Sequence, residues 1–211
     1  MEILYYHLVN KSTVFHKKIA LVIIFQCNKF IRSENMLVIK PYKRENAVEY
    51  ARKYAFGQNK FFASFEGIGG NCTNFVSQCI YAGGCQMNYT PTFGWYYISL
   101  DQRAPAWTGV EFFYNFMTTN EGVGPFGREA TADECEIGDV IQLANNTDGY
   151  YHTLIIVGFE GDEILVAAQT NDAYARPLSS YTNDYERFIK ILGIRYETPD
   201  EYSCFETLMQ G

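Results

Sequence analysis

The sequence predicts an α+β domain in which helices come first along the chain and an antiparallel sheet follows. Between residues 41 and 84, apolar residues recur at the three-to-four-residue spacing of amphipathic helices. After residue 137 the period changes to two, in short apolar runs separated by glycine-containing turns, which is typical of strands. With 211 residues, 47% of them hydrophobic, the chain can bury one sizeable core.

The first predicted helix starts at Pro41 and stops before Gly57. Proline is favoured in the first helical turn, where its missing N–H has no partner to lose. Apolar residues between positions 47 and 55 recur at helical spacing, and most charged residues fall between them. The pattern indicates an amphipathic helix with one solvent-exposed face.

The second predicted helix follows Gly69-Gly70 and places a cysteine in its first turn. Asn71 is a favoured N-cap residue, because its side-chain oxygen can accept a hydrogen bond from the first turn. Cys72 then takes the first helical position, and Gly83-Gly84 is a stop signal. Unpaired N–H groups and the helix dipole stabilise a thiolate at such a position, so Cys72 is a candidate nucleophile.

The remaining segments supply the sheet. Residues 86–134 are aromatic and rich in turns, with a short helix predicted over 110–117. The predicted strands are 140–143, 152–158, 164–169 and 188–196. The turn at 145–149 and the hairpin at Gly161-Asp162 join the first three. We therefore expect the helix that carries Cys72 to pack on an antiparallel sheet.

The chain divides into an accessory amino-terminal segment (1–40), a folded body (41–196) and a carboxy-terminal tail (197–211). The apolar run 19–25 is far shorter than the about 20 residues that cross a bilayer, so no integral membrane span is expected. A weak export signal, an extra strand or helix, and an upstream extension of the reading frame all stay open for the accessory segment. There is no clear signal peptide, and cytoplasmic and secreted or cell-wall locations both stay open.

Charge and cysteine content exclude several classes of function. The net charge is −7, without a basic stripe, which argues against nucleic acid as a partner. With no C-x-x-C pair and three histidines, we expect no structural zinc site, and no metal or cofactor is required. The irregular spacing of Cys72, Cys79 and Cys85 fits no disulfide framework, so we expect free thiols, which are easiest to keep in a reducing cytoplasm or in an anaerobe. The sequence indicates no oligomeric state.

A cysteine nucleophile needs a base whose pKa lies near neutrality, and histidine is the usual one. His7 and His16 lie in the accessory segment, which leaves His152 as the single histidine of the folded body. It opens an apolar strand directly after a polar turn, so its side chain can lie at the rim of the sheet. A lone histidine on a strand is more often an ordinary core or edge residue, and that interpretation stays open.

A third group should orient the imidazole, and we expect it on the strand that pairs with the His152 strand. Gln169, Asn171 and Asp172 are the candidates at the end of that strand. Alternation places Gln169 and Asn171 on one side. The competing interpretation is that residues 170–172 form a simple turn.

Two further assignments complete the predicted site. The backbone N–H of Cys72 would help to hold an oxyanion, with a second donor near residues 54–59 or from Tyr81. Asp139 follows a glycine at a strand start, and we interpret it as a turn residue that binds backbone amides rather than as a catalytic acid.

The sequence Asn71-Cys72-Thr73-Asn74-Phe75-Val76-Ser77-Gln78 and its continuation to Gly84 closely resembles the nucleophile helix of the bacterial "putative amidase" domain. That group is similar to a branch of the papain-like superfamily that contains the NlpC-type and CHAP-type cell-wall hydrolases. The similarity covers roughly residues 41–196 and extends to the segments 137–141, 152–157, 168–172 and 176–178.

The resemblance implies a papain-like cysteine hydrolase fold and a Cys–His–polar triad that cleaves an amide, with peptidoglycan peptides as the substrate. Cys72 matches the nucleophile and His152 the base. Gln169 stands where such domains have histidine or another polar residue, a departure that could shift the role to Asn171. Asn71 replaces a common aspartate, and both residues cap helices well.

Other functions stay open on the same scaffold. A catalytically weak or inactive module could bind glycan or peptide in an aromatic groove formed by Trp95, Tyr96, Tyr97 and Trp107. An acyltransferase, or a protease that acts on proteins, would use the same chemistry. The presence of both Cys72 and His152 favours an enzyme.

Overall fold

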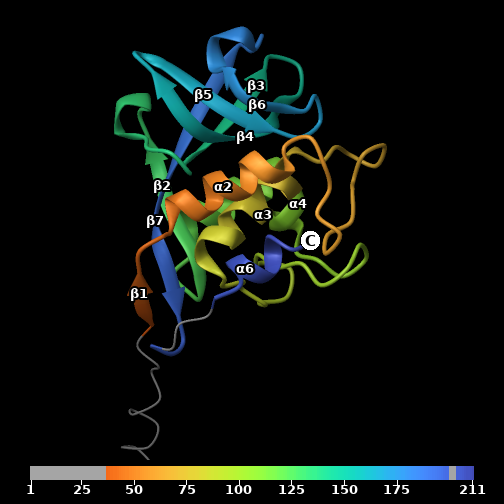
Figure 1. The fold of residues 1–211 in the computed structure, drawn as a ribbon, viewed down its shortest axis with the longest axis vertical. Coiled ribbons are helices and arrows are strands. Elements are labelled where there is room, and N and C mark those ends of the chain that lie inside the picture. Colours follow the sequence, from red (N-terminus) through yellow and green to blue (C-terminus); the bar gives the residue numbers. More distant parts are fainter. Residues whose placement is uncertain (1–36, 200–202) are drawn as a thin grey trace, which may run out of the picture. The chain divides into compact units, whose positions relative to one another are not determined.

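The computed structural model describes residues 37–199 and 203–211 and confirms the α+β class with an antiparallel sheet (Figure 1). The predicted accessory segment lies outside the described residues up to position 36. The helices are α2 (Arg44–Tyr54), α3 (Cys72–Gly84), α4 (Pro105–Thr108), α5 (Val110–Thr119) and α6 (Phe205–Leu208), with 3-10 turns η1 (Ala132–Glu134) and η2 (Leu178–Ser180). The strands are β1 (Val38–Lys40), β2 (Gly124–Ala130), β3 (Val140–Asn145), β4 (Gly149–Glu160), β5 (Glu163–Ala168), β6 (Ala173–Pro177) and β7 (Tyr185–Tyr196).

The sheet has the order β1-β7-β3-β4-β5-β6, and β2 also pairs with β7. All the pairings are antiparallel, and hairpin turns join β3 to β4, β4 to β5 and β5 to β6. Figure 1 shows α2 and α3 next to each other against this sheet. Strands β2 and β6 were not predicted, and β1 lies in the accessory segment, for which an extra strand was one of the open interpretations.

The sheet separates two apolar clusters, because side chains alternate between its faces. Ile155 of β4 packs in the larger cluster with the helices, against residues such as Phe75 and Ile80 of α3. Leu154 and Ile156 pack in a smaller cluster on the other face. This division decides which side chains of β4 can face the helices.

The first helix begins three residues later than predicted, at Arg44. Tyr42 is buried, its hydroxyl donates to the Gly138 carbonyl, and the Lys43 N–H donates to Gly83 O. These contacts hold residues 41–43 as a connection that runs from the sheet to the helix. The prediction that Pro41 starts the helix is therefore wrong.

The predicted glycine pair forms the last two residues of α3, which ends at Gly84, and it also permits close packing. A Cβ on Gly83 would lie 2.3 Å from the Tyr42 ring, and one on Gly84 would lie 2.6 Å from Ile194 Cδ1. Cys85 is the C-cap residue after Gly84 and takes the left-handed conformation with φ 52°. Non-glycine residues adopt this conformation at a C-terminus less readily than glycine does.

Trp95 and Trp107 are fully buried behind α3 and do not line a groove. The indole of Trp95 donates to Ser77 Oγ, and that of Trp107 donates to Asn74 Oδ1. The aromatic-groove prediction is therefore wrong for the two tryptophans, which support the buried helix that begins at Cys72.

Candidate active site

Cys72 is the first residue of α3, as predicted, and its free thiol is buried. Its Sγ lies 3.8 Å from Thr73 Oγ1. Within residues 37–199 and 203–211, the backbone N–H of Cys72 has no acceptor. This is the usual state of the first helical N–H groups, and it leaves a donor free beside the sulfur.

Asn71 occupies the N-cap position but does not cap the helix with its side chain. Its Oδ1 accepts hydrogen bonds from the Phe65 N–H at 3.2 Å and from Asn74 Nδ2 at 2.7 Å. The predicted capping bond is absent because the side chain joins the preceding loop to α3. Asn71 thus fixes the loop that leads to Cys72.

The start of α3 is also tied to the end of β5. The Asn71 N–H donates to Thr170 Oγ1 at 2.6 Å, and Asn71 Nδ2 donates to Gln169 Oε1. Thr170 takes φ 64°, a left-handed conformation that turns the chain back toward the helix. Cys72 is therefore held at the edge of the sheet where β5 ends.

Gln169 links the end of α2 to the beginning of α3. Its Nε2 donates to the carbonyls of Tyr54 and Gly57, both at 2.7 Å, while its Oε1 accepts from Asn71. Both amide hydrogens are thereby used. No hydrogen bond joins Gln169 to His152 among the described residues, so its predicted orienting role stays a prediction.

Asn171 and Asp172 are exposed in the turn between β5 and β6. Asn171 has φ 66°, which suits a turn. The interpretation of residues 170–172 as a turn agrees with this geometry. No hydrogen bond joins Asn171 to His152 among the described residues, so its orienting role stays a prediction.

His152 lies near the start of β4 with 6% of its surface exposed. Burial, with a smaller contribution from the Arg176 charge, lowers the pKa of its imidazole to about 4. Its Nε2 is buried and has no hydrogen-bond partner in the described part of the chain. The imidazole is therefore neutral at pH 7 and able to accept a proton.

The register of the sheet brings His152 level with the end of β5, but its side chain does not face α3: it lies opposite Leu143, which packs with Leu154 on the other face of the sheet. In the antiparallel pair of β4 and β5, Ile155 lies opposite Ala167. His152, three residues earlier, therefore lies level with the turn after β5, where Thr170 accepts a hydrogen bond from the Asn71 N–H. The next residue, Thr153, faces α3 and shares a 2.9 Å hydrogen bond with Thr73. No hydrogen bond joins the Cys72 sulfur to the imidazole in the described residues, and the pair stays a prediction.

Two residues beside His152 were missed by the sequence analysis. The Tyr181 ring lies 6.1 Å from the imidazole between ring centroids, and the Arg176 guanidinium stacks on that tyrosine at 4.0 Å. Neither stands in a recognisable strand or motif position. The sequence could have pointed to them only through the segment Arg176-Pro177-Leu178, which belongs to the family resemblance but was assigned no function.

Two of the expected sources of a second oxyanion donor, Asn59 and Tyr54, form hydrogen bonds elsewhere. The Asn59 amide donates to Leu208 O at 2.8 Å, and the Tyr54 hydroxyl donates to the same carbonyl at 3.0 Å. The Tyr81 ring packs edge-on against Trp107. The free N–H of Cys72 is the donor that the described site offers.

Asp139 binds backbone amides, as predicted. Its carboxylate accepts from the N–H groups of Glu136 and Ile191, both at 2.9 Å, and pairs with Arg44 at 2.7 Å. The residue is fully buried and joins α2 to β7. It is a structural acid, away from the thiol.

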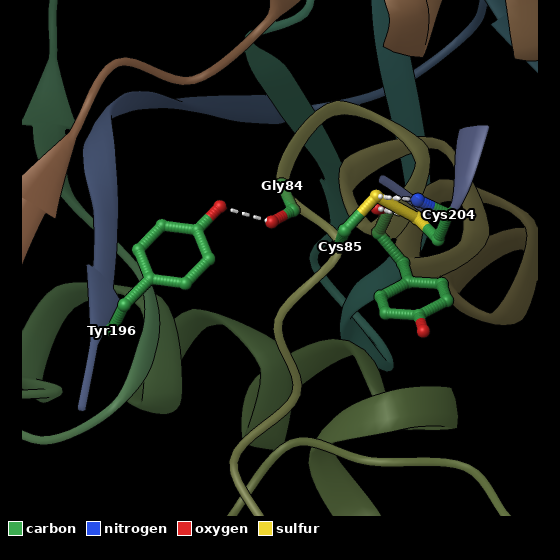
Figure 2. Close-up of a disulfide and its surroundings, with 5 residues drawn as sticks. Gly84, Cys85, Tyr196 and Cys204 are labelled. Carbon is green, nitrogen blue, oxygen red and sulfur yellow. Dashed lines mark hydrogen bonds between the residues drawn. A yellow bond between two sulfur atoms is a disulfide. The ribbon is translucent and has the colours of Figure 1, made fainter. Parts of the chain in front are cut away.

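Cys85 and Cys204 form a disulfide with Cα atoms 5.4 Å apart (Figure 2). This corrects the expectation that no disulfide framework exists, and with it the inference of a reducing compartment from free thiols. The two cysteines are 119 residues apart, so their spacing gave no signal. Figure 2 also shows the Tyr196 hydroxyl directed at the Gly84 carbonyl, to which it donates a hydrogen bond.

No group of three or more metal-binding side chains occurs within the described ranges. Of the helices described there, none is both long and apolar enough to cross a membrane.

Comparison with known proteins identifies the family. A family model described as "putative amidase domain" matches residues 41–192. The chain belongs to this family. Its amidase domain thus includes Cys72, His152 and Gln169, whereas Cys204 and α6 lie beyond the match.

One relative is "Uncharacterized protein YhbB" of Bacillus subtilis strain 168. It is 34% identical over 139 residues, which are 64% of this chain and 43% of that protein. The chain therefore matches less than half of the relative's length. No solved structure matches the chain.

Proposed function

We propose that the chain is a cysteine-dependent amide hydrolase of papain-like fold, related to the NlpC-type and CHAP-type enzymes, and that it cleaves peptide amides of peptidoglycan. The observation that carries the proposal is Cys72 at the first position of the buried helix α3, with an unpaired N–H beside its sulfur. Membership of the amidase family supports amide hydrolysis. The peptidoglycan substrate rests on the resemblance alone.

In the proposed mechanism, His152 accepts the Cys72 proton as the sulfur attacks the carbonyl carbon of the scissile amide. The Cys72 N–H donates to the oxyanion of the tetrahedral intermediate. His152 then gives the proton to the leaving amine, and the C–N bond breaks. Water, deprotonated by His152, attacks the thioester and releases the acid, which restores the thiol.

The low pKa of His152 suits the first step in one respect. At pH 7 the imidazole is neutral, so its lone pair is available. A base with a pKa of about 4 is weak. If substrate binding brings polar groups next to the buried imidazole, the pKa of His152 rises and it becomes a stronger base.

The test is digestion of purified peptidoglycan by the wild type and by Cys72→Ala, with product analysis by mass spectrometry. Cys79→Ala is the matched control, because Cys79 is a second free, buried cysteine of the same helix. We expect new amine ends with the wild type and the control, and none with Cys72→Ala. Equal products from all three would refute the proposal.

A binding module is the second candidate, and one surface favours it. A cavity of about 550 Å³ is lined by Phe93, Phe112 and Asn115, and the two phenylalanines are 84% and 61% exposed. Exposed aromatic rings beside an amide are suited to a glycan or peptide. Co-sedimentation with peptidoglycan that is lost in Phe93→Ala, without any cleavage by the wild type, would support this function instead.

A further inference from the structure

Two buried polar atoms without partners belong to two neighbouring rings, one on β4 and one directly after η2. They are Nε2 of His152 and the hydroxyl oxygen of Tyr181, and neither forms a hydrogen bond with another described residue. Their ring centroids are 6.1 Å apart, and the planes are tilted by 39°. Buried polar atoms are almost always hydrogen-bonded. Two such atoms on neighbouring rings, with no direct hydrogen bond between them, can be joined by one enclosed water.

The other residues that could orient His152 either form hydrogen bonds with other partners or are exposed. The Gln169 amide nitrogen donates to the carbonyls of Tyr54 and Gly57, and its oxygen accepts a hydrogen bond from Asn71. Asn171 is exposed in a turn. The Tyr151 ring also stacks on the imidazole, but its hydroxyl donates to Thr182 O. Tyr181 is the neighbour whose buried hydroxyl forms no hydrogen bond of normal geometry with a described residue, although the Arg176 guanidinium lies close enough to favour its charged form.

The Tyr181 ring is fixed from behind by Arg176. The guanidinium lies 4.0 Å from the ring centroid and donates to Ser180 through Nε at 2.7 Å and through a terminal nitrogen at 3.0 Å. Cation–π stacking of this kind restricts the ring. Burial raises the pKa of the Tyr181 phenol, so the hydroxyl keeps its proton at neutral pH.

We propose that Tyr181, not Gln169, is the positioning residue of His152, and that its hydroxyl accepts the hydrogen on Nε2 through one enclosed water. The inference deepens the proposed function and rests on it. A hydrogen held on Nε2 leaves Nδ1 with its lone pair, which is the form that can accept the Cys72 proton. The orienting group therefore comes from the segment after β6, and Gln169 holds the backbone around the nucleophile.

The test compares Tyr181→Phe, which removes one oxygen, with Tyr151→Phe as the matched control. Tyr151 is also a ring neighbour of His152, and it is 40% exposed. The substrate is the peptidoglycan peptide that the wild type cleaves. For Tyr181→Phe we expect kcat to fall about 10- to 100-fold with KM unchanged, as for other groups that orient a catalytic residue. The control should keep kcat within about threefold.

A second measurement does not depend on substrate. Two-bond ¹H–¹⁵N correlation spectra report which ring nitrogen of His152 carries the hydrogen. At pH 7 we expect the Nε2–H form to dominate in the wild type and in Tyr151→Phe, and to lose that dominance in Tyr181→Phe. The same hydrogen position and the same kcat in Tyr181→Phe as in the wild type would overturn the inference. If the wild type cleaves no amide, the proposed function fails, and the spectra still decide the role of Tyr181.

Discussion

Breaking the Cys85–Cys204 disulfide should destabilise the fold substantially. The bond closes a segment with a sequence separation of 119 residues. In the chain-entropy account, releasing a loop of this length restores about 5 kcal/mol of conformational freedom to the unfolded chain. We therefore expect the double variant Cys85→Ser/Cys204→Ser to unfold with a free energy about 3 to 5 kcal/mol lower.

The tail keeps other anchors in the folded state, so the loss should come mainly from the unfolded chain. Leu208 is buried, and its carbonyl accepts from the Tyr54 hydroxyl and the Asn59 amide. With a urea m-value of about 2 kcal/mol/M, the midpoint should move down by about 1.5 to 2.5 M.

The assay is equilibrium urea unfolding of the wild type and the double variant, each with and without reductant. Reductant should lower the midpoint of the wild type and leave that of the double variant unchanged. A loss below about 1 kcal/mol, which is within the spread of ordinary substitutions, would refute the reasoning. So would free thiols at both positions in the unreduced wild type.

Three further outcomes follow from the described contacts. Asp139→Asn removes the buried carboxylate that pairs with Arg44, but Arg44 is partly exposed and keeps its 3.6 Å ion pair with Glu136, so the loss of unfolding free energy in urea titrations should be about 1 to 3 kcal/mol; a loss like that of an exposed carboxylate variant would contradict this. Gly83→Ala, whose Cβ would lie 2.8 Å from Lys43 O, should cost about 1 to 3 kcal/mol in the same assay, whereas Gly57→Ala meets nothing within 4 Å and should be close to neutral. Burial lowers the pKa of His152 to about 4 in the folded protein, whereas in the unfolded chain it is about 6.5. As the pH falls below about 6.5, the unfolded chain therefore binds a proton first, and the unfolding free energy should drop by about 3 kcal/mol between pH 6.5 and 4. Above pH 6.5 His152 makes no contribution to the pH dependence. His152→Gln should remove this part of the pH dependence, and an unchanged slope would contradict the assigned burial.

Local patterns in the sequence sufficed for the α+β class and for Cys72 at the first position of α3. Apolar periodicity marked α3 and α5, and alternation marked β3, β4, β5 and β7. Strands β2 and β6 were missed because their residues are mostly partly exposed and include glycine and proline, so they lack the apolar alternation of a strand. Their position depends on pairing with β7 and β5.

The parts of the site that escaped prediction depend on long-range contacts. Gln169 was placed at the right strand end, but its bonds to Tyr54 and Gly57 join residues 112 to 115 positions apart. Tyr181 follows a 3-10 turn and reaches His152 only through the fold. Trp95 resembled a surface aromatic because burial behind α3 has no local signature.

The most direct test of the account is to look for an acyl group on Cys72 during turnover. Wild type that has been mixed with its peptide substrate is quenched in acid and mapped by mass spectrometry. The account predicts that the acyl fragment of the substrate is attached to the peptide that contains Cys72, and that Cys72→Ala neither carries it nor cleaves the amide. Cleavage by Cys72→Ala at the wild-type rate, with no adduct on Cys72 in the wild type, would contradict it.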